Sequence, residues 1–339
     1  MQLTEQSALL DDVTLTARRI FSVIAGELAQ VEAEFERQAR SNVQVIAYLG
    51  EYLRESGGKR VRPALTILAN YAAGGDGSRY NSIRMATVME FLHTATLVHD
   101  DIIDNSDTRR NRPTVNALCG NETAVLMGDW LYMSAFETSL AERSLAILDV
   151  LTRVTRKMTE GELLQLTTLG RTDVSEQQYF DIIERKTAYL FSACCEVGGI
   201  LGGAKEAEQK ALADYGRNLG MAFQLTDDLL DFTSTNDALG KAAGVDLLGG
   251  KVTLPLIDLL SREPAALEKV KTIMQEGGYD SVSREELIDQ LNSAGSIERA
   301  RASADGFASE ATKNLDSLPE SAYLDSLKAI PRYVLDRDR

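Results

Sequence analysis

The stretch LVHDDIIDNSDTRR, residues 97–110, combines an apolar helix with a dense group of charges. Asp100 and Asp104 lie one turn apart on one face of the predicted helix, and the apolar residues around them indicate that the helix is packed. Carboxylates at this spacing repel each other unless a cation lies between them. Mg²⁺ binds a few carboxylates together with phosphates and water, and Arg109 and Arg110 are suited to phosphate. The stretch therefore predicts a helix end that holds a cation and an anion together.

The same acidic spacing occurs again in QLTDDLLDF, residues 224–232, also within an apolar helix. The alternative interpretation is that both motifs are solvated faces of an acidic protein. Asp11 and Asp12 start the pattern in the same way but have no acid at the fifth position, so the dipeptide alone carries no signal. Two complete copies within apolar helices favour two cation-binding faces.

Three further motifs accompany the acidic pair. They are the basic loop GGKRVRP at residues 57–63, the pair Lys186-Thr187, and Gly240-Lys241 followed by Asp246 and Gly250-Lys251. With the acidic motifs, these residues resemble the trans-type polyprenyl diphosphate synthases, the head-to-tail family that includes farnesyl, geranylgeranyl and octaprenyl diphosphate synthases. The resemblance extends from about Gly57 to about Pro255 and is greatest to long-chain, octaprenyl-like members.

The pattern of apolar residues predicts an all-α fold. Six prolines and few alternating β-branched runs leave little room for a sheet, and apolar positions recur at three- and four-residue intervals. No linker or change in composition divides the chain. We expect residues 1–339 to form one domain, a helical bundle with a central cavity of the isoprenoid synthase type, with an N-terminal helix in 1–40 and C-terminal helices in 251–339. The expected helices span 12–40, 42–56, 62–73, 79–104, 120–140, 142–169, 175–202, 205–235, 251–262, 264–276, 283–294, 296–314 and 319–335.

The overall composition excludes several classes of protein. The net charge of −15 argues against a nucleic-acid partner, which would need a basic face. The three cysteines have no metal-binding spacing, and unpaired thiols in a reducing cytoplasm are the expected state. No signal peptide and no membrane span are predicted. A long lipid product would still allow peripheral contact with a membrane at product release.

The resemblance implies two substrate sites. Isopentenyl diphosphate would be held without metal by Lys59, Arg62, His93 and Arg110. Arg60 either shares this task or only packs, and His99, which points about 100° away from Asp100, is expected to be structural. The allylic diphosphate would be bound through Mg²⁺, with three ions when substrate is present. The direct metal ligands are expected to be Asp100, Asp104 and Asp227, while Asp101, Asp228 and Asp231 orient metal-bound water.

Basic and polar residues would complete the allylic site. Arg109, Lys186 and Lys241 are expected around the allylic diphosphate, and Lys251 approaches when the glycine-rich loop 238–250 closes. Asp246 either orients one of these lysines or caps a turn. The metal-bound diphosphate leaves, the allylic cation is attacked by isopentenyl diphosphate, and a proton is lost. The resemblance implies that the departing diphosphate takes this proton, while Thr187 and Gln224 present oxygen dipoles to the cation.

Product length should depend on what blocks the cavity beyond the first acidic motif. Short-chain members of the family often carry a bulky aromatic residue four or five positions before the first aspartate, where this chain has Ala95 and Thr96. Met89 and Leu92 lie deeper on the same helix, and the helix 128–140 offers Trp130, Tyr132, Met133 and Phe136 as floor residues. A long all-trans product near octaprenyl is predicted, with farnesyl or geranylgeranyl as the shorter alternative. A terpene cyclase and a non-catalytic subunit of a heteromeric synthase are the other hypotheses, and the resemblance implies a homodimer.

Overall fold

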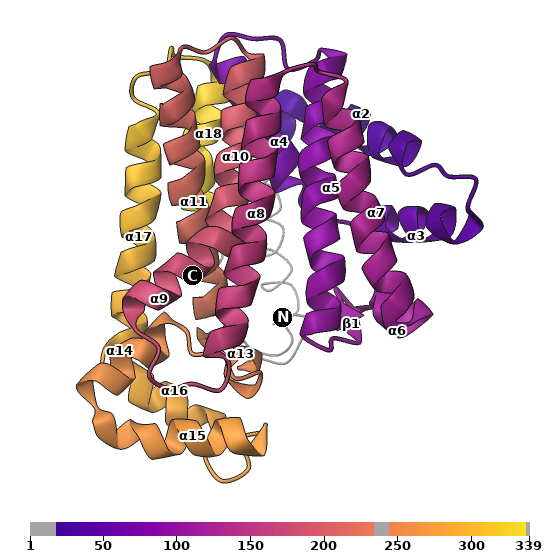
Figure 1. Cartoon of the computed structure of the whole chain (residues 1–339). Coiled ribbons are helices and arrows are strands. Elements are labelled where there is room, and N and C mark those ends of the chain that lie inside the picture. Colours follow the sequence, from indigo (N-terminus) through magenta and orange to yellow (C-terminus); the bar gives the residue numbers. More distant parts are fainter. Residues whose placement is uncertain (1–17, 234–243, 337–339) are drawn as a thin grey trace, which may run out of the picture.

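The computed structural model describes residues 18–233 and 244–336, and its helices stand side by side as an upright bundle (Figure 1). The central helices are α4 (Val61–Ala72), α5 (Tyr80–Ile103), α8 (Leu145–Thr168), α10 (Tyr189–Leu201) and α11 (Glu206–Thr233). They are flanked by α7 (Asn121–Leu140), α17 (Ser296–Asn314) and α18 (Ala322–Leu335). The all-α prediction is confirmed.

Shorter elements surround the central bundle. The helices α2 and α3 lie beside α5 and α7, and α14 to α16 gather below α11 and α17 (Figure 1). Their bounds are η1 (Ser22–Ile24), α2 (Ala25–Gln38), α3 (Gln44–Glu55), α6 (Val115–Cys119), α9 (Glu176–Ile183), α13 (Val245–Leu248), α14 (Leu254–Arg262), η3 (Pro264–Ala266), α15 (Leu267–Glu276) and α16 (Arg284–Ser293).

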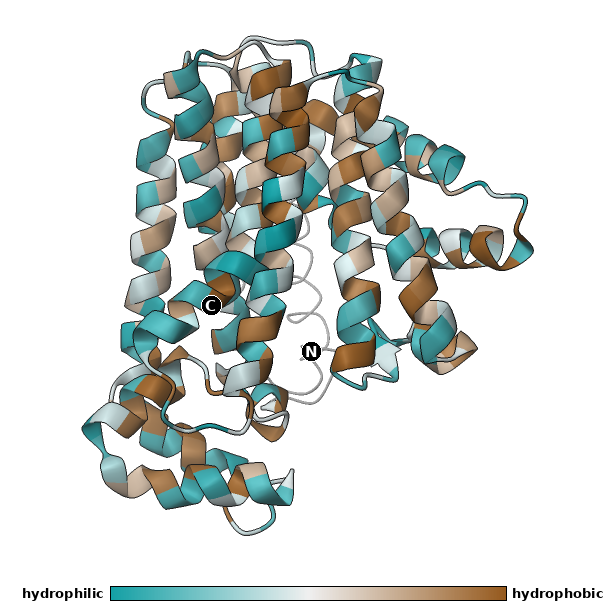
Figure 2. Ribbon diagram, viewed as in Figure 1, coloured by the Kyte–Doolittle hydropathy of each residue, from teal (hydrophilic) through white to brown (hydrophobic). Residues whose placement is uncertain are grey.

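Packing follows from where small and apolar residues recur. Hydrophilic and hydrophobic stretches alternate along most upright helices, as expected where one face packs (Figure 2). On α17, four buried alanines at positions 300, 304, 308 and 311 form such a face. Gly216 of α11 lies against α10 so closely that a Cβ there would sit 2.8 Å from the Ser192 Cα. Small residues therefore let α11 approach both neighbours.

Two local departures from regular helix lie beside the cavity that is described in the next section. A π-helical turn, Glu184–Ala188, joins α9 to α10 and carries Lys186 and Thr187; such turns occur often at functional sites. The hairpin of β1 (Thr108–Arg109) and β2 (Arg112–Pro113) turns at Arg110 and Asn111, whose φ values are +51° and +60°. Positive φ at both central positions suits a two-residue hairpin, and it strains a non-glycine backbone.

Several expected helix boundaries differ from the structure, including the starts of α8 and α18, each of which lies three residues later than expected. The described part of segment 12–40 contains the 3₁₀ turn η1 before α2, not one continuous helix. The helix expected over 251–262 begins only at Leu254, because Pro255 is favoured in the first turn of a helix. The segment 175–202 is interrupted by the π-helical turn. Element type was therefore predicted better than element ends.

Candidate active site

A large cavity opens between α5, α7, α8 and α11, with a volume of about 1390 Å³. Its wall also includes the π-helical turn and residues 251–253. Apolar residues from both hydrophobic clusters of the bundle line it, including Met158 and Leu190 from one and Tyr179 and Val252 from the other. The cavity therefore lies where the two halves of the core meet.

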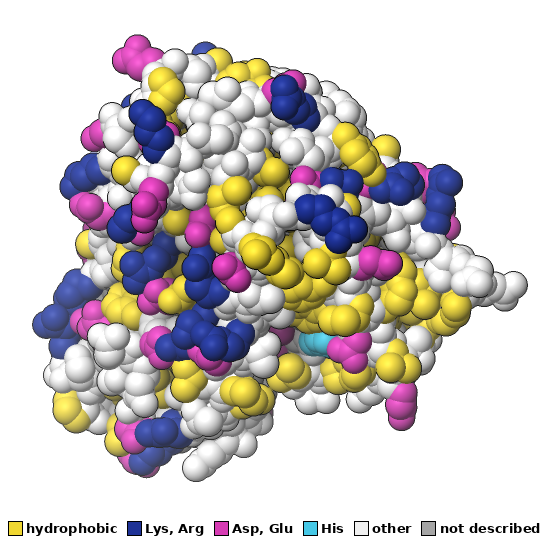
Figure 3. Space-filling view, turned by 45° about the horizontal axis from the view of Figure 1, so that its top comes forward, with side chains coloured by type: hydrophobic (Ala, Val, Ile, Leu, Met, Phe, Trp, Pro, Cys, Tyr) yellow, Lys and Arg dark blue, Asp and Glu magenta, His cyan; other side chains and the backbone are white. Residues whose placement is uncertain are grey.

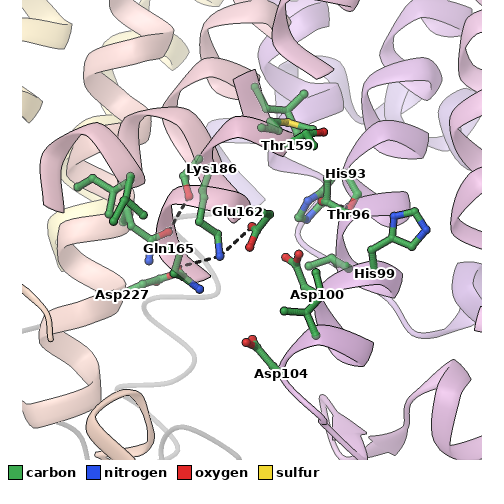
Figure 4. Close-up of a pocket in the computed structure, with 18 of the residues that line it drawn as sticks. His93, Thr96, His99, Asp100, Asp104, Thr159, Glu162, Gln165, Lys186 and Asp227 are labelled. Atoms are coloured by element: carbon green, nitrogen blue, oxygen red, sulfur yellow. Dashed lines mark hydrogen bonds and ion pairs between the residues drawn. The ribbon is translucent and has the colours of Figure 1, made fainter. Parts of the chain in front are cut away.

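The two acidic motifs face each other across this cavity. Asp100 and Asp104 project from α5, and Asp227 lies opposite them on α11 (Figure 4). Asp228 of the second motif also lines the wall. In residues 18–233 and 244–336, no three acidic, histidine or cysteine side chains converge closely enough to form a ready-made cation site. A metal bound here would have to complete its coordination with phosphate and water oxygens, as Mg²⁺ commonly does.

The carboxylates of this site are costly to ionise when they are alone. Burial and the charge of Glu162 raise the pKa of Asp100 to about 7. Burial and the charge of Asp246 raise the pKa of Asp228 to about 8. Like charges in an enclosed cavity disfavour ionisation, and a divalent cation would reverse that effect. The donor set therefore fits a hard cation.

These pKa values predict how the stability of the cation-free protein changes with pH. Both folded-state values lie above the usual aspartate value of 3.8, so the folded protein holds more protons than the unfolded chain and loses stability as the pH rises through 7 and 8. Burial lowers the pKa of His93 well below its usual value, so His93 opposes the change, but only weakly above pH 7, where the histidine of the unfolded chain is also mostly neutral. We expect the free energy of unfolding to fall by about 1–2 kcal/mol between about pH 7 and about pH 8.5.

Urea denaturation in a chelating buffer measures this change. The Asp228→Asn variant, which has no charge to gain at that position, should show a smaller fall over the same interval. Added Mg²⁺ and inorganic diphosphate should remove most of the fall in the free energy of unfolding that is seen with the wild-type protein. Stability that rises with pH over this interval would contradict the prediction.

A group of basic residues lines another part of the same cavity. Lys59, Arg62, His93 and Arg110 all line the cavity, as the resemblance implies. Arg62 is half-buried with its Nε fully enclosed, burial lowers its pKa, and this Nε has no hydrogen-bond partner among the described residues. Burial and the charge of Arg62 lower the pKa of His93 well below its usual value. Buried cations without acceptors are unfavourable, so this part of the cavity is suited to an anion.

The structure decides the open question on Arg60. Its guanidinium donates to Glu90 Oε1 at 2.6 Å and also pairs with Glu32 of α2. Its backbone adopts φ +48° at the start of α4. The charge of Arg60 is therefore neutralised by two glutamates, and these ion pairs hold the loop 57–62 in place. His99 is also accounted for, since its Nε2 lies 3.1 Å from the Val125 carbonyl oxygen on α7, and the ring points away from Asp100 (Figure 4).

The lysines on the cavity wall are held by carboxylates. Lys186 lies 2.8 Å from Glu162 Oε1 and donates to Gln165 Oε1 at 3.0 Å (Figure 4). Lys251 lies 3.1 Å from Asp104 Oδ2, which links segment 251–253 to α5. Both ammonium groups are thus already positioned at the acidic faces. Lys241 lies outside the described residues.

Thr187 and Gln224 belong to one hydrogen-bond chain. The Thr187 hydroxyl donates to Gln224 Oε1 at 2.7 Å, and Gln224 Nε2 donates to Asp228 Oδ1 at 2.8 Å. The Tyr179 hydroxyl donates to the second oxygen of Asp228 at 2.6 Å. All four residues line the cavity.

Several predicted site residues are placed differently from expectation. Asp101 does not line the main cavity, because it turns toward Arg109 and accepts a hydrogen bond from it at 2.9 Å. Asp231 is also absent from the wall, since its oxygens accept the backbone N–H groups of residues 244–246 at 3.1–3.2 Å. Asp231 therefore anchors α13, and in this structure both carboxylates accept hydrogen bonds from protein groups.

The structure also shows which of the residues expected along the product path line the cavity and which are packed in the core. Thr96 lines the cavity, whereas Ala95, Met89 and Leu92 are fully buried in the core and do not. One residue step turns a side chain by about 100°, which is enough to move it from the wall into the packing. Of the floor candidates, Trp130 is not on the wall. The path beyond the acids is lined by Thr96, Tyr132, Met133, Phe136, Thr155, Met158 and Thr159.

Sequence reasoning missed Glu162, Gln165 and Tyr179. The first two interrupt the apolar face of α8 at a spacing of three, where a buried face would ordinarily continue. That interruption was a usable signal. Tyr179 gave none, because a tyrosine on an amphipathic helix is usually ordinary core.

Two acidic helix ends facing across a deep cavity, with a group of basic residues in the same cavity, define this bundle as an isoprenoid synthase. The sequence profile of the polyprenyl synthetase family matches residues 43–291. The chain belongs to that family.

Individual relatives agree with this assignment. The octaprenyl diphosphate synthase of Escherichia coli is 38% identical over 326 residues, which cover 96% of this chain and all of that protein. The crystal structure of a decaprenyl diphosphate synthase from Rhodobacter capsulatus matches with a TM-score of 0.89 and 35% identity, over 95% of this chain and 99% of that one. A polyprenyl synthase from Caulobacter crescentus, complexed with calcium and isoprenyl diphosphate, gives a TM-score of 0.89 at 33% identity, over 95% and 98% of the two chains.

Proposed function

We propose that this protein condenses an allylic diphosphate with isopentenyl diphosphate and repeats the step to make a long all-trans polyprenyl diphosphate. The observation that carries this proposal is that two facing acidic motifs share one cavity with a group of basic residues, among them Arg62, whose buried Nε has no hydrogen-bond partner among the described residues. The allylic diphosphate would be bound through metal ions, and isopentenyl diphosphate would be bound directly by basic side chains. The charge of each site would therefore distinguish the two substrates. A terpene cyclase, which uses one substrate, would have no need for the basic group.

The roles follow from the placements. Mg²⁺, for which we propose three ions with substrate bound, would be held by Asp100, Asp104 and Asp227. The ions would stabilise the leaving diphosphate. Lys186, Lys251 and Arg109 would add positive charge around it, and by resemblance Lys241 would too. Lys59, Arg62, His93 and Arg110 would hold the diphosphate of the nucleophile.

The allylic cation needs negative dipoles and a dry site. Gln224 and Thr187 would present their oxygens to it, and the apolar walls would exclude water. No serine, cysteine or histidine is proposed as the base. The departing diphosphate would take the proton, since it is the nearest strong acceptor once the carbon–oxygen bond has broken.

The length of the product would be set at the far end of the cavity. Along α7 the wall runs from Asp129 to Phe136, and along α8 from Glu162 back to Thr155. Each run covers eight residues, and the seven steps along it span about 10 Å of helix. Phe136 and Thr155 are the deepest lining residues on these helices, so Phe136 is the proposed floor. The small Thr96 leaves the entrance to this path open.

The direct test is incubation of the purified protein with Mg²⁺, isopentenyl diphosphate and farnesyl diphosphate, followed by chromatographic sizing of the products. We expect a long chain near octaprenyl. Thr96→Phe should give products shorter by several isoprene units, and Phe136→Ala should give longer ones. Matched replacement of the core residue Met89 by Leu should leave the distribution unchanged.

Other outcomes separate the alternatives. A cyclic hydrocarbon would indicate a cyclase, and no product without a second protein would indicate a subunit of a heteromeric synthase. A farnesyl or geranylgeranyl end product would indicate a short-chain enzyme. Unchanged product length in both cavity variants would contradict the assigned path.

We further propose a homodimer formed through α7. Leu126, Met133 and Leu140 are 68%, 62% and 50% exposed and recur every seven residues, which places them along one stripe. Hydrophobic side chains gather on the right half of the surface in Figure 3, the side on which α7 lies in Figure 1. Exposed apolar surface of this kind commonly marks a protein contact.

The remaining assignments concern location and domain organisation. The three free cysteines support a cytoplasmic location. Among the described helices, none has both the length and the apolar character to cross a bilayer. Ile103, Leu163 and Leu166 are exposed at the cavity wall and would suit peripheral membrane contact at product release. We propose that residues 1–339 act as one domain.

A further inference from the structure

Tyr179 is a buried cavity residue to which the proposed chemistry gives no task. Its side chain on α9 packs against Phe180, with ring centroids 5.6 Å apart, and only 4% of its surface is exposed. Its hydroxyl donates to Asp228 Oδ2 at 2.6 Å. A hydroxyl placed this deeply must be paired, and here it is paired with a carboxylate of the second acidic motif.

The Asp228 carboxylate fixes which way the Gln224 amide points. Gln224 Nε2 donates to Asp228 Oδ1, and Gln224 Oε1 accepts from Thr187. If the amide were flipped while Asp228 is ionised, as it would be with a cation in the cavity, its oxygen would face a carboxylate oxygen, and two acceptors would oppose each other. The Thr187 hydroxyl can donate or accept, so it does not enforce the orientation. That task falls to Asp228.

The orientation matters because Gln224 lines the cavity. A carbonyl oxygen stabilises a neighbouring carbocation, whereas the amide N–H₂ group carries positive partial charge and would oppose it. We infer that Tyr179 is a positioning residue that holds Asp228, and through it the Gln224 oxygen, toward the allylic cation. This inference rests on the proposed prenyl transfer.

A double-mutant cycle tests whether Tyr179 acts through Gln224. Tyr179→Phe removes only the hydroxyl and should lower kcat about tenfold, with the KM of each substrate and the half-saturating Mg²⁺ concentration within about twofold of wild type. Gln224→Met removes the amide. The double variant should be no slower than Gln224→Met alone, because without the amide nothing remains for Tyr179 to orient. Losses that multiply, or a raised Mg²⁺ requirement, would overturn the inference.

The matched control is Tyr215→Phe. Tyr215 is fully buried and its hydroxyl donates to the Leu327 carbonyl oxygen at 2.7 Å, but it does not line the cavity. This variant should lose stability comparably while keeping its kcat. An equal loss of kcat in both variants would show that any missing buried hydrogen bond has this effect, and would overturn the inference.

A crystal structure of Tyr179→Phe supplies a readout without turnover. The Gln224 side chain should lose its single orientation there, and an unmoved, well-ordered amide would overturn the positioning role. A wild-type protein that makes no prenyl product, together with a displaced Gln224 in the variant, would defeat the proposed function alone.

Discussion

Replacing Asp100 with asparagine is expected to lower kcat about a thousandfold, with little loss of fold. The change removes one charge from the α5 side of the cavity, where the leaving diphosphate would be bound through Mg²⁺. Metal stabilisation of a developing phosphate charge is worth several kcal/mol, and about 1.4 kcal/mol corresponds to a factor of ten. Steady-state kinetics at several Mg²⁺ concentrations measure the effect, and the half-saturating concentration should rise as well.

The neighbouring aspartate provides the control. Asp101 belongs to the same motif, but its carboxylate is bound to Arg109 and lies off the main cavity. Asp101→Asn should therefore cost far less, and its Mg²⁺ dependence should stay near that of wild type. Equal losses in the two variants would mean that the motif acts through helix stability and not through cation binding. Asp100→Asn should also leave the metal-free protein at least as stable, since burial disfavours the charge that it removes.

Replacing Arg62 with methionine is expected to weaken isopentenyl diphosphate binding strongly while stabilising the ligand-free protein. The guanidinium has a buried, unpaired Nε, and its Cζ lies 4.9 Å from the centroid of the Phe191 ring. Losing a buried charge that pairs with the substrate should raise the KM for isopentenyl diphosphate about a hundredfold or more. The same loss removes an uncompensated charge from the empty site and should add about 1 kcal/mol to the free energy of unfolding.

Arg60→Met separates substrate binding from packing. Its charge is already shared between Glu32 and Glu90, so its removal should destabilise the protein. If the assignments are correct, denaturation curves will show that Arg62→Met is more stable than wild type and that Arg60→Met is less stable. Substrate kinetics will show the raised KM for isopentenyl diphosphate in Arg62→Met. Arg62→Met with unchanged KM, or with lower stability than wild type, would contradict the view that its charge is reserved for a ligand.

Function and fold were predictable from this sequence to different depths. Apolar residues repeating every three to four positions are a local property, so the helices, and with them the all-α class, could be predicted directly. The acidic motifs gave the chemistry because two carboxylates one turn apart must share a face. Thr187 and Gln224 were expected near the cavity, and the structure brings them within 2.7 Å of each other.

What a side chain contacts was less predictable than what it is. Asp100 and Asp101 are adjacent and chemically identical, yet one faces the cavity and the other faces Arg109. Asp231 fits the motif as well as Asp227 does, but the backbone of residues 244–246 takes up its oxygens. The motif specifies only the spacing of its aspartates. The group that binds each aspartate comes from another segment, such as residues 244–246, which fold back over the motif.

The sequence by itself determined a helical protein with two acidic faces and a basic loop, because periodicity and residue chemistry act over a few positions. Only the tertiary structure decided that Glu162 holds Lys186, that Tyr179 reaches Asp228, and that Thr96 rather than Ala95 meets the cavity. Each of these depends on helices distant in sequence being packed at a particular rotation. A rotation of about 100° about a helix axis moves a side chain from the cavity wall into the packed core, although the sequence stays the same.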